Sequence, residues 1–153
     1  MRTEDPRTIR LVDYQPPLFT VETVDLTFDL EPEVTEVTTR LHMVRRGAGA
    51  LHLDGEDLDL VSLSIDGRQL DPTAFTKDAE SLSIPGVPDE FDLETVVRID
   101  PQSNTKLEGL YRSNGTWCTQ CEAEGFRRIT YFPDRPDVMA TYRVTIRAAR
   151  SEA

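Results

Sequence analysis

The sequence predicts an all-β protein, namely a multi-strand antiparallel β-sandwich or saddle-like β domain with at most one short helix. Apolar and polar residues alternate in many short segments, and no long segment repeats with the period of a helix. Short strands separated by turn residues are typical of sandwiches and not of parallel α/β sheets. The 153 residues suit one domain with an ordinary hydrophobic core, and we expect it to cover residues 1–153.

The first two strands are predicted over residues 24–30 and 37–43, where mostly apolar residues occupy every second position. Between them, Glu31, Pro32 and Glu33 predict a turn, because Pro cannot donate to a strand ladder and the two acids prefer water. We therefore expect an antiparallel hairpin here.

The alternation continues toward the carboxyl terminus and predicts strands over residues 51–53, 61–65, 82–84, 91–99 and 142–146. The dipeptide Asp66-Gly67 suits the positive φ angles of a tight hairpin turn. The best helical candidate is segment 134–140, where Asp134 can cap and Pro136 tolerates the first turn. Residues 1 to about 17 are rich in Pro and charge, and we expect them to be extended.

The charge balance restricts the partners. Lys and Arg number 17 against 28 Asp and Glu, which gives a net charge of −11. This sign argues against nucleic acid and membrane surfaces as partners and favours cationic ligands such as free amino termini, although acidity also simply keeps proteins soluble. Segment 1–14 lacks the apolar core of a secretory signal, and no stretch approaches the ~20 apolar residues of a membrane span. We therefore expect a cytoplasmic location.

The histidines and cysteines form no complete metal or catalytic motif. His42 and His52 stand outside any H-E-x-x-H pattern, and we expect neither to bind a metal. Cys118 and Cys121 form a C-x-x-C pair, which could be a zinc half-site or a thiol redox centre. No second pair of soft ligands and no following helical pattern accompanies them, so we expect reduced structural thiols. G-x-S-x-G and Gly-rich phosphate motifs are also absent, so an independent enzyme is not expected.

Residues 117–137 form a dense run of polar, aromatic and charged residues without clean alternation. Such a run suits a loop that presents groups to a partner. It equally suits an ion-paired connection, in which Arg127, Arg128 and Arg135 pair with acids of the same run. Composition alone favours the second interpretation.

The stretch that begins C-T-Q-C-E-A-E-G-F-R at Cys118 and ends D-R-P-D-V at Val138 resembles one in the aminopeptidase N enzymes of bacteria, which are zinc gluzincins. Shorter likenesses lie in segments 24–30, 51–58 and 108–111. The resemblance implies the amino-terminal domain of a zinc metalloaminopeptidase, whose separate catalytic domain holds zinc through H-E-x-x-H and carries a G-x-M-E-N motif. Neither motif occurs here, so the resemblance implies a fragment that is inactive by itself, with no cofactor in this chain and zinc in the full-length enzyme.

By motif position, the resemblance implies that Gln120 and Glu122 bind substrate. A carboxylate at Glu122 would anchor the cationic amino terminus of a peptide through a charge-assisted hydrogen bond, which an internal peptide nitrogen cannot reproduce. Gln120 offers a donor and an acceptor that would orient the first residue. Glu124 is a competing anchor, and only the resemblance ranks Glu122 above it. Neither residue is expected to be catalytic.

Two partners follow from this hypothesis, a peptide amino terminus and the catalytic domain of the same full-length chain. Without that domain an apolar surface should be uncovered, so self-association of the fragment is expected. The alternative is a free-standing β-sandwich binding or interaction module without peptidase activity.

Overall fold

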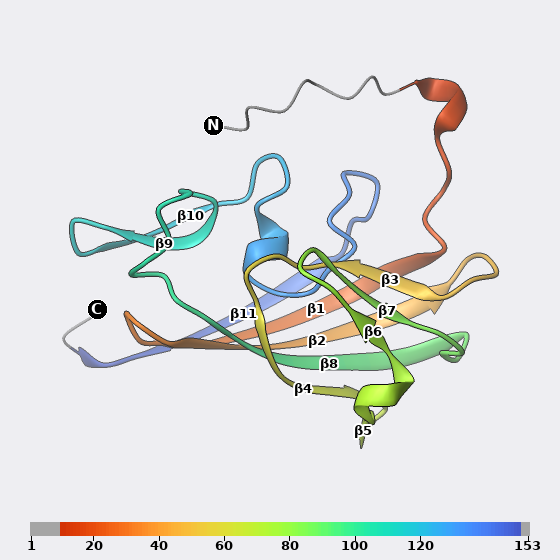
Figure 1. Cartoon of the computed structure of the whole chain (residues 1–153), viewed down its shortest axis with the longest axis horizontal. Coiled ribbons are helices and arrows are strands. Elements are labelled where there is room, and N and C mark those ends of the chain that lie inside the picture. Colours follow the sequence, from red (N-terminus) through yellow and green to blue (C-terminus); the bar gives the residue numbers. More distant parts are fainter. Residues whose placement is uncertain (1–9, 151–153) are drawn as a thin grey trace.

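The computed structural model describes residues 10–150 (Figure 1). Within this range the chain forms three sheets and three single-turn 3₁₀ helices, and the all-β prediction is confirmed. The strands are β1 (Phe19–Leu30), β2 (Thr35–Arg45), β3 (Leu51–Asp54), β4 (Asp59–Ile65), β5 (Arg68–Gln69), β6 (Thr76–Lys77), β7 (Ser81–Ile84), β8 (Glu90–Ile99), β9 (Gly109–Ser113), β10 (Thr116–Gln120) and β11 (Thr141–Ala148). The 3₁₀ helices are η1 (Leu11–Asp13), η2 (Pro72–Ala74) and η3 (Phe126–Arg128).

The largest sheet has the strand order β11-β1-β2-β8-β4-β5. Strands β1 and β2 form the expected antiparallel hairpin, and the Thr35 hydroxyl closes its turn by donating to the Glu31 carbonyl at 2.7 Å. The turn between β4 and β5 is also as predicted, with φ angles of 49° at Asp66 and 75° at Gly67. Strand β11 departs from the antiparallel prediction, because it runs parallel to β1 with Leu26 opposite Val144. The long connection from β1 to β11 allows this pairing.

The core lies between the largest sheet and the three-stranded sheet β3-β7-β6, which covers part of one face (Figure 1). Strand alternation directs one set of side chains inward, including Val24, Leu41 and Leu93 from the large sheet. Leu53 and Leu82 meet them from the small sheet. Burial of these apolar side chains is the main stabilising contribution to such a fold.

Three buried threonines join the later part of the chain to the large sheet. The Thr39 hydroxyl of β2 donates to the Thr130 hydroxyl at 2.7 Å, and the Thr95 hydroxyl of β8 lies 3.4 Å from the same oxygen. A second link is the isolated antiparallel bridge between Asp54 and Phe132. These contacts hold the segment after η3 against the core.

The helix predicted over residues 134–140 is wrong. Short turns occupy this segment, with hydrogen bonds from the Arg135 amide to the Pro133 carbonyl and from the Val138 amide to the Arg135 carbonyl. Asp134 cannot cap a helix there, because its carboxylate accepts from Arg127 instead. Residues 1 to about 17 were expected to be extended, and the first nine of them lie outside the described residues. From residue 10 onward this segment contains the 3₁₀ helix η1.

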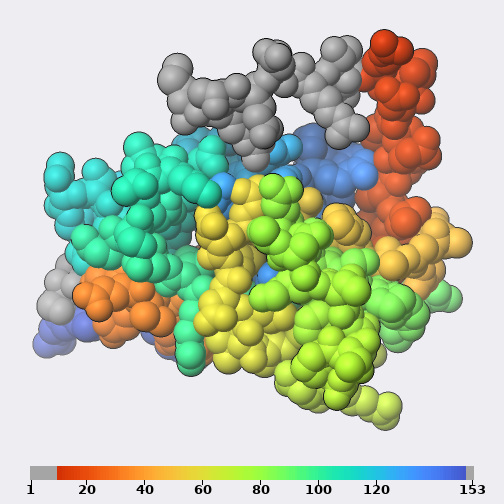
Figure 2. All heavy atoms as spheres, in the orientation of Figure 1, coloured from red at the N-terminus to blue at the C-terminus, as the bar shows by residue number. Residues whose placement is uncertain are grey.

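Two projections mark the ends of the molecule in Figure 2. The teal β9–β10 hairpin lies beside the orange β1–β2 turn at one end. The Pro32 carbonyl of that turn accepts from the Gln102 amide in the β8–β9 connection. The red segment before β1 lies at the other end. In the part of the chain that the structure describes, no helix is long and apolar enough to cross a membrane.

Candidate functional site

The run predicted to carry function begins on the β9–β10 hairpin. Asn114 and Gly115 form its turn with φ angles of 51° and 84°, a conformation that Asn and Gly tolerate better than other residues. The hairpin register pairs Gln120 with Gly109 and so ends β10 at Gln120. The hairpin therefore delivers Gln120 to the start of the following loop.

A tight turn over residues 121–125 follows. The Gly125 amide donates to the Cys121 carbonyl at 2.9 Å. A Cβ atom at position 125 would lie 2.3 Å from the Gln120 carbonyl oxygen, so only glycine fits where the chain doubles back. This close approach projects Glu122, Ala123 and Glu124 outward, and all three are exposed.

Gln120 and Glu122 lie together on this exposed turn. The Gln120 side-chain amide donates to the Glu122 backbone carbonyl at 3.2 Å, which orients the Gln120 side chain. Among residues 10–150, no ion pair or hydrogen bond engages the Glu122 carboxylate. The Glu124 carboxylate differs, because it lies 3.8 Å from the Arg127 guanidinium.

Arg127 follows the turn over residues 121–125 and fixes it to the rest of the domain. Its Nε atom donates to the Asp134 carboxylate at 3.1 Å, and a second nitrogen donates to the Asp134 carbonyl at 3.2 Å. Its Nη1 atom also lies 3.8 Å from the Asp54 carboxylate and 3.9 Å from that of Glu56. Burial lowers the pKa of Arg127, but the hydrogen bond to Asp134 and the nearby acids outweigh this and raise it overall. Arg127 therefore remains a cation that joins four acidic residues, namely Asp54, Glu56, Glu124 and Asp134.

Arg128 anchors the neighbouring position and is nearly fully buried, with 8% of its side chain exposed. It donates to the carboxylates of Glu56 and Asp57 and, at 3.1 Å, to that of Glu108. A hydrogen bond from Lys106, together with the charge of Arg128, holds the pKa of Asp57 below its usual range. The Arg128 side chain thus links η3, the β3–β4 connection and the start of β9.

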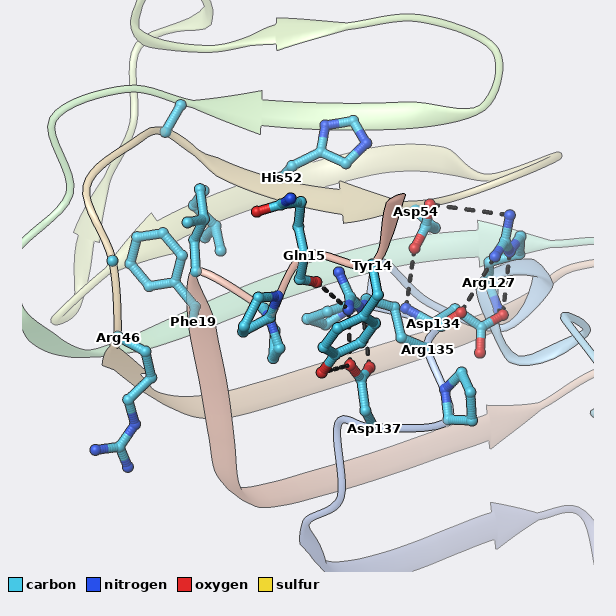
Figure 3. A pocket seen from close by; sticks show the side chains of 18 of the residues that line it. Tyr14, Gln15, Phe19, Arg46, His52, Asp54, Arg127, Asp134, Arg135 and Asp137 are labelled. Atoms are coloured by element: carbon cyan, nitrogen blue, oxygen red, sulfur yellow. Dashed lines mark hydrogen bonds and ion pairs between the residues drawn. The ribbon is translucent and has the colours of Figure 1, made fainter. Parts of the chain in front are cut away.

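A third anchor lies at a large pocket of about 1060 Å³, shown in Figure 3. Arg135 donates to both Asp137 carboxylate oxygens, at 2.8 and 2.7 Å, and also to the Gln15 carbonyl. The Tyr14 hydroxyl donates to Asp137 from the other side. Chiefly through the Arg135 hydrogen bond, the pKa of Asp137 falls to about 2. Because these charged groups pair with one another, they fasten the segment before β1 to the end of the run.

The expected ion-paired connection is therefore confirmed, but its acids were only partly predicted. Asp134 and Asp137 lie within the run, as expected. Asp54, Glu56 and Asp57 come from the β3–β4 region, which spacing could not associate with Arg127 or Arg128. Their one signal in the sequence is that the acids lie in segment 51–58, which carries a shorter likeness to the same enzymes.

The remaining candidates take structural positions. Cys118 and Cys121 are free thiols, and burial raises the pKa of Cys121, which disfavours the reactive thiolate. His42 lies on β2, with Nδ1 2.9 Å from the Asp92 carboxylate. Within residues 10–150, no group of three or more His, Cys, Asp and Glu side chains could hold a metal ion.

The fold and the site together define a class of protein. It is a β domain that carries an exposed acidic turn, and the ion pairs of Arg127 and Arg128 hold this turn in place. Residues 20–153 match the peptidase M1 N-terminal domain, and the chain belongs to this family. The family inferred from the 118–138 motif is thus confirmed.

Individual relatives agree with this assignment. The chain is 53% identical to the aminopeptidase N of Caulobacter vibrioides over 150 residues, which are 97% of this chain and 17% of that protein. It is 45% identical to the aminopeptidase N of Escherichia coli K12, over 94% of this chain and 17% of that protein. The solved structure of Legionella pneumophila aminopeptidase A in complex with aspartic acid superposes with a TM-score of 0.87 at 35% identity, over 94% of this chain and 18% of that one. The chain therefore spans less than a fifth of the length of each of these relatives.

Proposed function

We propose that this chain is the substrate-recognition part of an aminopeptidase that removes amino-terminal residues from peptides. Glu122 binds the cationic amino terminus, and Gln120 orients the first residue. The observation that carries the proposal is the Glu122 carboxylate, which has no partner among residues 10–150 and lies beside an oriented Gln120. Such a carboxylate gives a strong hydrogen bond to an ammonium group and none of comparable strength to an internal amide.

The pairing of the neighbouring acids supports Glu122 over Glu124. The Glu124 carboxylate lies 3.8 Å from the Arg127 guanidinium, whereas the Glu122 carboxylate has no ion pair or hydrogen bond within residues 10–150. The base formed by Arg127 and Arg128 limits movement of the turn, which lowers the entropy lost when substrate binds.

Hydrolysis itself belongs to another part of a longer protein. The donor groups of residues 10–150 do not fit a zinc site, so no step of the reaction is assigned to a metal held here. In this proposal zinc is held by a catalytic domain of the same full-length chain, and residues 118–138 complete the substrate pocket beside it. The isolated chain is then inactive.

Kinetics of the full-length enzyme test the role of Glu122. Glu122→Ala should lower kcat/KM for aminoacyl substrates by roughly 30-fold or more, because truncating one partner of a desolvated charge pair costs about 2–5 kcal/mol. Glu124→Ala is the matched control and should change kcat/KM by less than about threefold, since the Glu124 side chain is 51% exposed and its ion pair with Arg127 is long, at 3.8 Å. Unchanged kinetics for Glu122→Ala would show that the carboxylate does not bind substrate.

The uncovered edge of the large sheet supports the proposed contact with a further domain. Tyr142, Val144 and Ile146 of β11 lie in register with buried residues of β1, yet they are 47%, 53% and 64% exposed. This apolar strip is the surface that we propose the rest of the protein covers. In the isolated chain it remains available to a second copy.

Sedimentation of the isolated chain tests this surface. We expect concentration-dependent association, and Val144→Asp should reduce it because a carboxylate at the centre of the strip opposes apolar contact. Thr145→Asp is the matched control, because position 145 lies on the opposite face of the same strand. A strict monomer at high concentration, or equal effects of both substitutions, would contradict the expectation.

A further inference from the structure

A second pocket, separate from the exposed turn, has an acidic lining. Its volume is about 800 Å³, and it lies between the β1–β2 turn, the β3–β4 connection and the β6–β7 turn. In Figure 2, blue atoms of a later segment are visible between the yellow β3–β4 connection and the green residues near the β6–β7 turn. The charged lining residues are Glu33, Asp57, Asp59, Asp78 and Asp100, with Lys77 and Arg98 as the cations. The excess of carboxylates makes this pocket attractive to cations.

Tyr131 is a lining residue and is almost completely buried, with 2% of its surface exposed. Its ring packs directly on Gly55, where an added Cβ atom would come within 2.3 Å of the ring carbons. The Tyr131 hydroxyl makes no hydrogen bond to any residue of the described range 10–150. The hydroxyl is not one of the fully enclosed polar atoms, and Tyr131 lines the pocket, so its hydrogen-bonding capacity is available to a ligand there.

Tyr131 lines the same pocket as Asp59 and Asp78. Burial raises the pKa of Tyr131, and the negative charges of Asp78 and Asp59 raise it further. Both acids line the pocket, so the hydroxyl is near the charges that a bound cation would meet. A neutral phenol can accept a hydrogen bond from an N–H group.

The carboxylates that line the pocket differ in how many hydrogen bonds and ion pairs they already make. Asp57 pairs with Lys106 and Arg128, while Asp78 and Asp100 accept backbone amides from Glu80 and Ser103. Asp59 makes neither a hydrogen bond nor an ion pair within residues 10–150. Its charge is therefore available to a ligand.

Apolar residues complete the lining. Val34, Leu58 and Ile99 lie among the acids and can contact an alkyl stem. A cationic head on an alkyl stem matches this combination better than a bare ion does. No group of metal-ligating side chains occurs in the described part of the chain, which agrees with an organic cation.

We propose that this pocket binds a primary ammonium group on an alkyl chain, with its N–H donating to the Tyr131 hydroxyl and its charge facing Asp59 and Asp78. The same chemistry occurs in a free alkylamine and in the lysine side chain of a polypeptide. The proposal is independent of Glu122, which is not a lining residue of this pocket.

Titration of the ¹⁵N-labelled 153-residue chain tests the proposal, with n-butylammonium and Nα-acetyl-lysine amide as probes. We expect saturable shifts at the Gly55 amide with at least one probe, weakened by added salt. The neutral control is n-butanol for the first probe and the Nε-acetylated compound for the second, and neither should saturate. Stronger binding of butylammonium indicates a free amine, whereas stronger binding of the lysine compound indicates a polypeptide side chain.

Two variants separate binding from folding. Tyr131→Phe keeps the ring and should weaken binding about tenfold, as expected for loss of a hydrogen bond to a charged group. Asp59→Asn changes an exposed side chain and should weaken binding several-fold, while Asp13→Asn, on exposed η1, should have no effect. Equal binding by the neutral probes, absence of saturation with both amines, or unchanged affinity in both pocket variants would overturn the proposal.

Discussion

The 118–137 segment has an exposed tip, which is the turn with Glu122 and Glu124, and a largely buried base, which contains Arg127 and Arg128. Both parts carry charged side chains, but they differ in whether those side chains form ion pairs within the chain. At the base, Arg127 and Arg128 are largely buried and contact acids from several parts of the chain. At the tip, Glu122 is exposed, and its carboxylate makes no hydrogen bond or ion pair with any of residues 10–150. The comparison indicates that the ion pairs hold the shape of the loop, while the carboxylate of Glu122 remains available for recognition.

The largest effect on stability should come from Arg128. Arg128→Ala should lower the free energy of unfolding by about 3 kcal/mol, because it removes one of the two arginines that face the nearly buried Glu56 carboxylate. Chemical denaturation of the 153-residue chain measures this value. Arg143→Ala is the control, since its 82% exposed side chain pairs weakly with Asp25 and should contribute less than about 1 kcal/mol. If both variants lost a similar free energy of unfolding, the buried ion pairs of Arg128 would contribute no more to stability than an exposed ion pair does.

A smaller effect should come from Asp137, which fastens the end of the loop. Its folded-state pKa of about 2 lies below the usual value, so its contribution to stability is present above about pH 4 and is lost as the pH falls toward 2. Because the group is partly exposed, we expect this contribution to stay under about 1 kcal/mol. Asp137→Asn should flatten the pH dependence of unfolding between about pH 4 and 2. An unchanged slope would show that the Arg135 contact adds no stability.

Local patterns predicted most of the fold. The alternation in segment 91–99 and the Asp66-Gly67 turn each depend on neighbouring residues, and both predictions were confirmed. The parallel pairing of β11 with β1 joins residues more than a hundred positions apart, and no local pattern encodes it. The predicted helix over 134–140 was wrong for a related reason, since Arg127 takes the carboxylate that would have capped it.

Less of the candidate site than of the fold could be predicted from the sequence. Spacing could not associate Arg128 with Glu56 and Asp57, because only the folded chain brings the β3–β4 connection to η3. Residue types alone also could not distinguish Glu122 from Glu124, and the ranking came from the resemblance to aminopeptidase N. The structure adds a physical difference, because Arg127 lies near Glu124 and Glu122 has no such cation among the described residues.

The most direct test of the proposed recognition role of Glu122 is the preference of the proposed full-length aminopeptidase for free over N-acetylated amino termini. Glu122→Gln keeps the size of the side chain and removes its charge, so it isolates the electrostatic contribution. We predict that the ratio of kcat/KM for the free to the acetylated substrate falls roughly 30-fold or more, through slower reaction of the free substrate. An unchanged ratio, in an enzyme that remains folded, would contradict the account.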